Sequence, residues 1–213
     1  WLYYPYERRW EPVIKSKFAG KKPRGANASA LEYIPDRKVS LWMKQDGTWS
    51  YGAGNNTWTE MKPNGGELKH GDRLGHAWEG VTVYIPKRKI VVSAGGDRPS
   101  RDRKAWVGRT NVYSVATNTW SRVAEGEGVP WGSTASTPFV YDSNADVCLL
   151  YHGRLKQFWA FDVGKSKWSR ITPKGPELPG KIRPMSYYDP ERNAWVIQRG
   201  NKVWVYRHKL REK

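Results

Sequence analysis

A short aromatic motif recurs along this chain of 213 residues and limits the folds that it can adopt. An aromatic residue, six intervening residues and a tryptophan occur together at four places, each time with a polar turn sequence between the rings. The four pairs are Tyr3–Trp10, Tyr51–Trp58, Tyr113–Trp120 and Phe161–Trp168. This regularity indicates a repeat architecture in which the recurring unit is a strand, a tight turn and a second strand.

A second unit alternates with the aromatic–tryptophan hairpin. Each copy has a tyrosine, a polar turn of three to five residues and a short apolar run. The runs lack the alternation of a half-exposed strand, are too short for a helix and end near glycine, so they are predicted to be buried strands. The tyrosines are Tyr33, Tyr84, Tyr141 and Tyr188, and the runs are 39–43, 90–94, 147–151 and 194–197.

Together the two hairpins predict an all-β fold built from four-stranded antiparallel units of about 50 residues, the spacing typical of β-propeller blades. Such a unit cannot bury both of its faces alone, so neighbouring units must stack. The richness in Trp and Tyr agrees with this, because bulky rings suit a pleated, half-buried surface.

The second repeat resembles the kelch motif, which has an apolar run ending in two glycines and then an aromatic residue, six residues and Trp. Here these elements are 90–94, Gly95, Gly96, Tyr113 and Trp120. The other repeats keep less of the motif, with one glycine or none. The resemblance, which extends to the central propeller of galactose-oxidase-like proteins, implies one kelch-type β-propeller domain over 1–213. The blade parts are expected at 1–14, 27–61, 77–123, 134–171 and 184–209.

The two ends of the chain supply different parts of a blade. Residues 1–14 read as the third and fourth strands, and 184–209 read as the first three strands. Two arrangements follow: a ring of about four blades with one redundant strand, or an arc cut from a ring of five to seven blades. We favour the arc, and the absence of an initiator methionine leads us to expect a processed or incomplete N-terminus within a larger chain or assembly.

The formal charge is +17, from 37 Lys and Arg against 20 Asp and Glu. Such a field favours an acidic protein surface, an acidic polymer or nucleic acid as the partner, although a solvated surface that keeps the chain soluble is an alternative. In a meander the connections alternate between two faces, and the longer loops and most of the excess charge fall on one of them. We expect binding residues in the loops 97–109 and 15–26 of that face: Arg98, Arg101, Arg103, Lys104, Trp106, Lys21, Lys22 and Arg24.

Residues for catalysis or metal binding form no recognisable pattern. The four histidines, His70, His76, His152 and His208, lack metal-ligand spacing. The single cysteine, Cys148, lies in an apolar run and is expected to be a small buried hydrophobe, which excludes a disulfide framework and argues against copper-radical chemistry. No cofactor, metal or membrane span is expected, and the compartment stays open.

Three functional hypotheses follow. The first is a non-enzymatic interaction or scaffold protein that binds an acidic partner through the basic loop face. The second is a propeller-type enzyme acting on carbohydrate at the central channel. The third is a basic, nucleic-acid-associated subunit of a large assembly, which the charge supports but no recognised module does.

Overall fold

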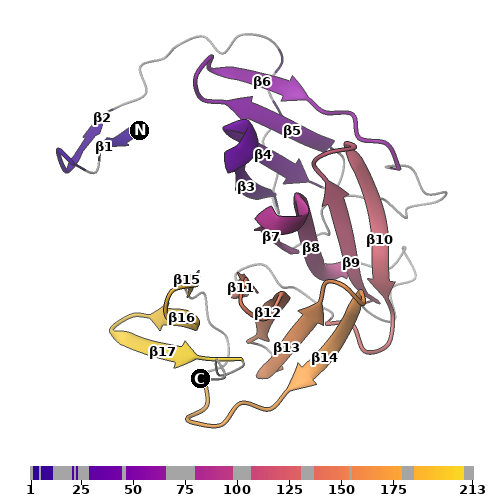
Figure 1. The fold of residues 1–213 in the computed structure, drawn as a ribbon, viewed down its shortest axis with the longest axis vertical. Coiled ribbons are helices and arrows are strands. Elements are labelled where there is room, and N and C mark those ends of the chain that lie inside the picture. The colour runs from indigo at the N-terminus through magenta and orange to yellow at the C-terminus, as the bar shows by residue number, and fades with distance from the viewer. Residues whose placement is uncertain are drawn as a thin grey trace.

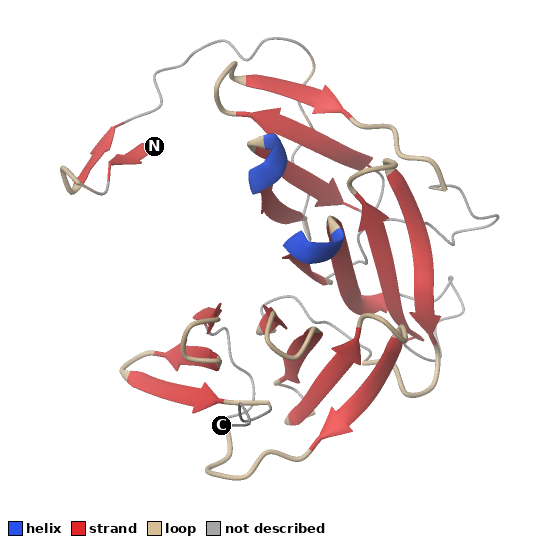
Figure 2. Ribbon diagram, viewed as in Figure 1, coloured by secondary structure: helices blue, strands red, loops and turns tan. Residues whose placement is uncertain are grey.

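The protein is described from a computed structural model, and nearly all of its described residues with regular structure lie in β-strands (Figure 2). Two short 3₁₀ helices, η1 (Pro35–Arg37) and η2 (Pro86–Arg88), interrupt the strands. The described residues are 2–4, 6–11, 21, 23, 29–44, 47–65, 80–97, 107–130, 137–153, 155–178 and 185–208.

The described strands form three four-stranded sheets, one three-stranded sheet and one two-stranded hairpin, all antiparallel. The N-terminal hairpin is β1 (Leu2–Tyr4) and β2 (Arg9–Glu11). The first sheet is β3 (Ala30–Ile34), β4 (Val39–Lys44), β5 (Gly47–Gly52) and β6 (Thr57–Glu60). The second sheet is β7 (Val81–Ile85), β8 (Ile90–Asp97), β9 (Val107–Ser114) and β10 (Thr119–Glu125). The third sheet is β11 (Phe139–Asp142), β12 (Val147–His152), β13 (Gln157–Asp162) and β14 (Lys167–Ile171). The fourth sheet is β15 (Met185–Asp189), β16 (Ala194–Arg199) and β17 (Lys202–Tyr206).

The four sheets follow one another along an arc, with β3, β7, β11 and β15 on its concave side (Figure 1). Within each sheet the strand order in space equals the order in the chain, so each sheet is a simple meander. This is the arrangement of β-propeller blades, and the predicted all-β propeller fold is confirmed. Among the described residues the fourth sheet has three strands, and no strand pairing joins the N-terminal hairpin to it.

Sheets pack face to face, which explains why the apolar runs do not alternate. In β12 every residue is buried. Cys148 and Leu150 belong to the cluster shared with the second sheet, whereas Leu149 and Tyr151 belong to the cluster shared with the fourth. Both faces of this strand are therefore covered. The expectation for Cys148 is confirmed, because its thiol is completely buried and burial raises its pKa.

The repeated tryptophans lock neighbouring sheets together. Trp120 is 2% exposed and its indole Nε1 donates to Thr48 Oγ1 of the first sheet at 3.0 Å. Trp168 repeats this contact on the second sheet, donating to Thr110 Oγ1 at 2.7 Å. The expected packing of these two tryptophans between blades is confirmed, and Trp58, on the outer face of the first sheet, is half-buried.

The turns of both repeated hairpins share one backbone geometry. The fifth residue after the leading aromatic residue has a positive φ near 50° in each described hairpin, although none of these residues is glycine. Asparagine tolerates this left-handed conformation better than most residues. The residues are Arg8, Lys38, Asn56, Lys89, Asn118, Asp146, Ser166 and Asn193.

Two boundaries differ from the sequence prediction. Strand β8 does not end at Gly95 and Gly96 but continues to Asp97, because both glycines stay in register with β9. Strand β9 begins at Val107, so the loop expected over 97–109 is shorter at both ends. Arg109 therefore belongs to the sheet, where its Nε donates to Glu125 Oε1 at 2.9 Å.

Candidate interaction surface

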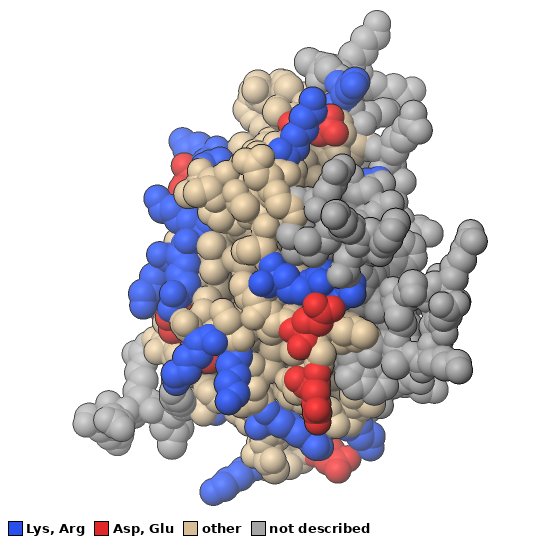
Figure 3. Space-filling view, turned by 90° about the vertical axis from the view of Figure 1, so that its right-hand side faces the viewer, with Lys and Arg blue, Asp and Glu red and all other residues tan. Residues whose placement is uncertain are grey.

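The connections between strands divide the arc into two opposite faces. We call the strands of a sheet a to d, counted from the concave side. The described a–b and c–d turns lie on one side, which we call the turn face, and the described b–c turns after β12 and β16 lie on the other, which we call the loop face. Figure 3 looks onto the outer edge of the arc, where Lys and Arg side chains gather along one side and over the lower part of the described surface, with smaller acidic clusters beside them.

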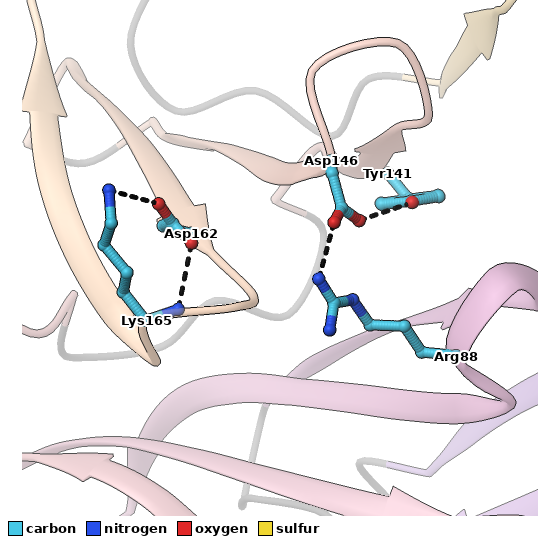
Figure 4. A network of polar contacts seen from close by, with 5 residues as sticks. All are labelled: Arg88, Tyr141, Asp146, Asp162 and Lys165. Carbon is cyan, nitrogen blue, oxygen red and sulfur yellow. Dashed lines mark hydrogen bonds and ion pairs between the residues drawn. The ribbon is translucent and has the colours of Figure 1, made fainter.

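Charged side chains on the turn face join neighbouring sheets. Between the first and second sheets, Lys89 Nζ lies 3.7 Å from Asp36 Oδ2. Between the second and third, Arg88 Nη2 lies 2.6 Å from Asp146 Oδ2, and Tyr141 donates its hydroxyl proton to the other carboxylate oxygen at 2.7 Å (Figure 4). The Arg88 guanidinium, with help from the Tyr141 bond, lowers the pKa of Asp146 below its usual value.

A buried carboxylate joins the third and fourth sheets on the same face. Asp142 is fully buried, and its Oδ1 accepts from the backbone N–H groups of Asn144 and Ala145 at 3.0 and 2.9 Å. The Tyr188 hydroxyl lies 2.6 Å from the same oxygen. Burial, followed by the bond to Asp142, raises the pKa of Tyr188 to about 12. Three carboxylates of the turn face, those of Asp36, Asp142 and Asp146, thus make contacts between sheets.

The loop face is described where the third and fourth sheets meet, and it is hollowed there. A pocket of about 490 Å³ lies between the b–c turns of these two sheets and the segment that follows β14. Its lining is basic and includes one indole. The charged and aromatic lining residues are Lys156, Arg199, Lys202, Glu177 and Trp204.

Two contacts shape this pocket. Lys156 Nζ lies 3.3 Å from Glu177 Oε2, and both side chains are exposed. The Tyr151 hydroxyl donates to the carbonyl oxygen of Leu178 at 2.9 Å in a buried position, which ties the segment after β14 to the third sheet. With three cations and one carboxylate, the lining has an excess of positive charge.

The structure places only one of the binding residues predicted from the sequence. Lys21 is exposed. The other seven lie outside the described residues: Lys22, Arg24, Arg98, Arg101, Arg103, Lys104 and Trp106. In sequence, the last five fall between β8 and β9 of the second sheet. The loop-face pocket is instead formed by the b–c turns of the third and fourth sheets.

A second pocket, of about 570 Å³, lies on the concave side of the arc, where the innermost strands meet. Glu32 of β3 is its one described acidic lining residue, and Thr82 Oγ1 donates to Glu32 Oε1 at 2.6 Å. Burial raises the pKa of this carboxyl, outweighing the opposite effect of the Thr82 bond. Tyr141, Tyr188 and Lys87 also line the pocket, so its surface is polar as well as aromatic.

Glu32→Gln is expected to increase the free energy of unfolding at neutral pH. Because the folded-state pKa of Glu32 is raised, the ionised form opposes folding above that pKa, by about 1.4 kcal/mol for each unit of difference. The advantage of the glutamine variant should shrink as pH falls through the folded pKa, where the wild-type carboxyl becomes neutral. Urea unfolding of both proteins between pH 4 and pH 8 measures this, and a difference that does not change with pH would contradict it.

Sequence reasoning missed several residues that position these surfaces. Asn118 accepts the Tyr113 hydroxyl at 2.7 Å and donates to the carbonyl oxygen of Met61 at 2.6 Å, thereby linking two sheets. The sequence does contain a pattern that points to Asn118, because Asn or Asp stands five residues after several of the motif tyrosines. Thr48 and Thr110 carried no comparable signal, because their role depends on a tryptophan in another sheet.

In the described part of the chain, no group of three or more His, Cys, Asp and Glu residues could hold a metal ion. Neither 3₁₀ helix of the described residues, nor any other helix there, is long and apolar enough to span a membrane.

No protein-family model matches the chain, and no curated protein matches it in sequence. Solved structures match it over 80 to 84% of its length. They include a protein of unknown function from Bacteroides thetaiotaomicron (13% identity, TM-score 0.49) and a putative TolB from Agrobacterium tumefaciens (11%, 0.49). A chain of the Mitotic Checkpoint Complex matches with 11% identity and a TM-score of 0.49. The chain spans 39 to 57% of those three structures. The fold itself, an all-β protein made of propeller-type blades, is shown by the successive meander sheets of the described residues.

Proposed function

We propose that this chain is a non-enzymatic, kelch-type interaction or scaffold propeller that binds an acidic protein surface through its loop face. The observation that carries the proposal is the basic pocket formed by Lys156, Arg199 and Lys202 around Trp204. Lysine and arginine attract and orient an acidic partner, and an indole supplies a large, rigid contact surface. The net charge of +17 strengthens that attraction over longer distances.

The different roles of charged side chains on the two faces also support the loop face as the binding surface. On the turn face, Lys89 and Arg88 pair with carboxylates of the neighbouring sheet. These cations therefore already have partners within the arc. Loops on a rigid scaffold are where binding residues concentrate. We extend the proposed surface to Arg98, Arg101, Arg103, Lys104 and Trp106 and to Lys21, Lys22 and Arg24, which belong to connections on the same face in the predicted meander.

Reversing three charges of the loop-face pocket is expected to weaken binding of an acidic ligand. The variant is Lys156→Glu with Arg199→Glu and Lys202→Glu, and the probe is a fluorescently labelled poly-glutamate peptide. Affinity, measured by fluorescence anisotropy at physiological salt, should fall about tenfold or more, because favourable pairs become repulsive. Reversing Arg98, Arg101 and Arg103 together should have an effect of the same kind.

A matched control removes the effect of net charge. Lys38→Glu, Lys87→Glu and Lys167→Glu change the charge by the same amount at exposed positions of the turn face. This variant should bind the peptide nearly as tightly as wild type. Equal losses in the two triple variants would show attraction to net charge alone and would contradict a defined surface. Preference for a DNA duplex over the peptide at matched charge would favour the nucleic-acid hypothesis instead.

The concave pocket supports a second candidate, carbohydrate chemistry, through the carboxyl of Glu32 and the phenols of Tyr141 and Tyr188. A glycosidase normally needs two carboxyl groups about 5–10 Å apart. Among the described lining residues Glu32 supplies one. Incubation with a panel of aryl glycosides tests this candidate, and turnover that is lost in Glu32→Gln would establish it in place of the scaffold proposal.

A further inference from the structure

Glu177 is the one acidic residue in the described lining of the loop-face pocket, and it already pairs with one of the pocket's cations. Lys156 Nζ donates to Glu177 Oε2 at 3.3 Å. The same two residues, with Leu178, also line a smaller pocket of about 200 Å³ beside Tyr151. The carboxylate of Glu177 therefore occupies the place that a carboxylate of an acidic partner takes when it binds Lys156.

The backbone that presents Glu177 is held in place on both sides. Pro176 precedes it and has a fixed φ. Leu178 follows it, is buried in the cluster between the third and fourth sheets, and accepts the Tyr151 hydroxyl with its carbonyl oxygen at 2.9 Å. Rotation about the side-chain bonds is thus the main freedom left to Glu177. Its carboxylate is presented to Lys156 at a high effective concentration.

The pair between Lys156 and Glu177 is nevertheless easy to exchange, because both side chains are open to solvent. The side chain of Lys156 is 58% exposed and that of Glu177 is 84% exposed. Exposed ion pairs shift an equilibrium by only about two- to fivefold. A partner that brings several carboxylates to the pocket therefore displaces Glu177 at small cost.

Glu125 in the second sheet shows the opposite case. It is the last residue of β10, where Arg109 Nε donates to its Oε1 at 2.9 Å and Arg122 Nη1 donates to its Oε2 at 3.0 Å. These two arginine side chains are only 13 and 14% exposed. Removing the carboxylate from cations that are largely buried is costly. Glu177, unlike Glu125, is therefore placed to exchange with a carboxylate from outside the chain.

We infer that Glu177 is an internal competitor of the acidic partner for Lys156, and that it sets the affinity of the loop-face pocket and the kind of partner that the pocket accepts. The inference rests on the proposed function, since it concerns the same surface. A partner with one isolated carboxylate exchanges one ion pair for another and gains little. A partner with a cluster of acidic side chains replaces Glu177 and also reaches Arg199 and Lys202. The favoured partner is therefore a protein segment with several acidic side chains close together.

A double-mutant cycle on peptide binding tests the inference. Glu177→Gln removes the competing charge and keeps the side-chain shape, and Lys156→Met removes the cation and keeps most of its length. The probe is the fluorescently labelled poly-glutamate peptide, followed by anisotropy at physiological salt. Glu177→Gln should bind it about threefold more tightly or more, because Lys156 is released and a repulsive charge is lost. In the Lys156→Met background, the same substitution should gain less than half as much on a free-energy scale.

Glu191→Gln is the matched control, because it removes the same charge at an exposed position of the turn face. It should change the affinity by less than about 1.5-fold, since charges farther apart than about 8 Å are largely screened at this salt concentration. Equal gains in Glu177→Gln and Glu191→Gln would overturn the inference. So would a gain from Glu177→Gln that is the same with and without Lys156, because competition for that cation would then play no part.

The remaining outcomes separate this inference from the proposed function. If reversing Lys156, Arg199 and Lys202 weakens binding but Glu177→Gln leaves it unchanged, the inference fails and the proposed surface stands. If the triple reversal binds like wild type, or neither wild type nor Glu177→Gln binds the peptide, both fail. Binding by Glu177→Gln alone would support the inference, because the internal carboxylate would then block the pocket completely.

Discussion

Replacing Trp120 by alanine should lower the free energy of unfolding by about 3–5 kcal/mol, the range for large buried aromatic residues. Trp120 is 2% exposed and sits between the first and second sheets, with its ring centroid 5.2 Å from that of Tyr113. The substitution opens a cavity there and also removes the hydrogen bond to Thr48. Urea unfolding followed by circular dichroism measures the loss.

Trp58 is the matched control, because it holds the same place in the repeat but lies on an open face. Trp58→Ala should lower the free energy of unfolding by less than half as much as Trp120→Ala. Thr48→Val isolates the hydrogen bond, since it keeps the shape of the side chain and leaves the indole N–H of Trp120 unpaired, at a cost of about 1–3 kcal/mol. Equal losses at positions 58 and 120 would contradict the assignment of the tryptophans to contacts between sheets.

Replacing Asn118 by alanine should cost about 3 kcal/mol, although this residue lies in a turn. Its φ of 53° is unfavourable for alanine, a penalty of about 1 kcal/mol or more. Its side chain also makes the bonds to Tyr113 and Met61, each worth about 1 kcal/mol or more. Thermal and urea unfolding of the variant measure the combined loss.

Asn118→Gly separates the two causes. Glycine accepts the left-handed backbone at little cost, so this variant should lose only the hydrogen bonds and should be more stable than Asn118→Ala. If the two variants are equally unstable, backbone strain at this turn contributes nothing. If neither is destabilised, the turn does not connect the first and second sheets as described.

The repeat spacing was enough to predict the blades, because each hairpin is a local feature with its own turn chemistry. The buried strands and the packing of Trp120 and Trp168 followed from the same pattern. The ends of strands were harder to predict. The sequence placed a strand end at Gly95 and Gly96, but both glycines pair with β9 and β8 continues to Asp97. Cross-strand pairing overrides local propensity in such places.

The surfaces could be predicted only in part. The sequence predicted excess charge on the loop face, but it did not reveal that Lys156, Arg199 and Lys202 converge on one pocket, because they come from two sheets. Likewise, Glu32 gave no signal as the acid of the concave pocket, since its burial depends on the neighbouring β7. Contacts between repeats, unlike those within a hairpin, depend on how the sheets stack.

Hydrogen-exchange mass spectrometry of the chain with and without the poly-glutamate peptide tests the central claim most directly, because it reads both faces at once. Binding to the loop face predicts slower exchange in the b–c turns at 153–156 and 199–202 and in the loop 98–106. The turn-face segments 35–38 and 86–89 should exchange at unchanged rates. Protection confined to those turn-face segments, with none in the b–c turns, would contradict the proposed surface.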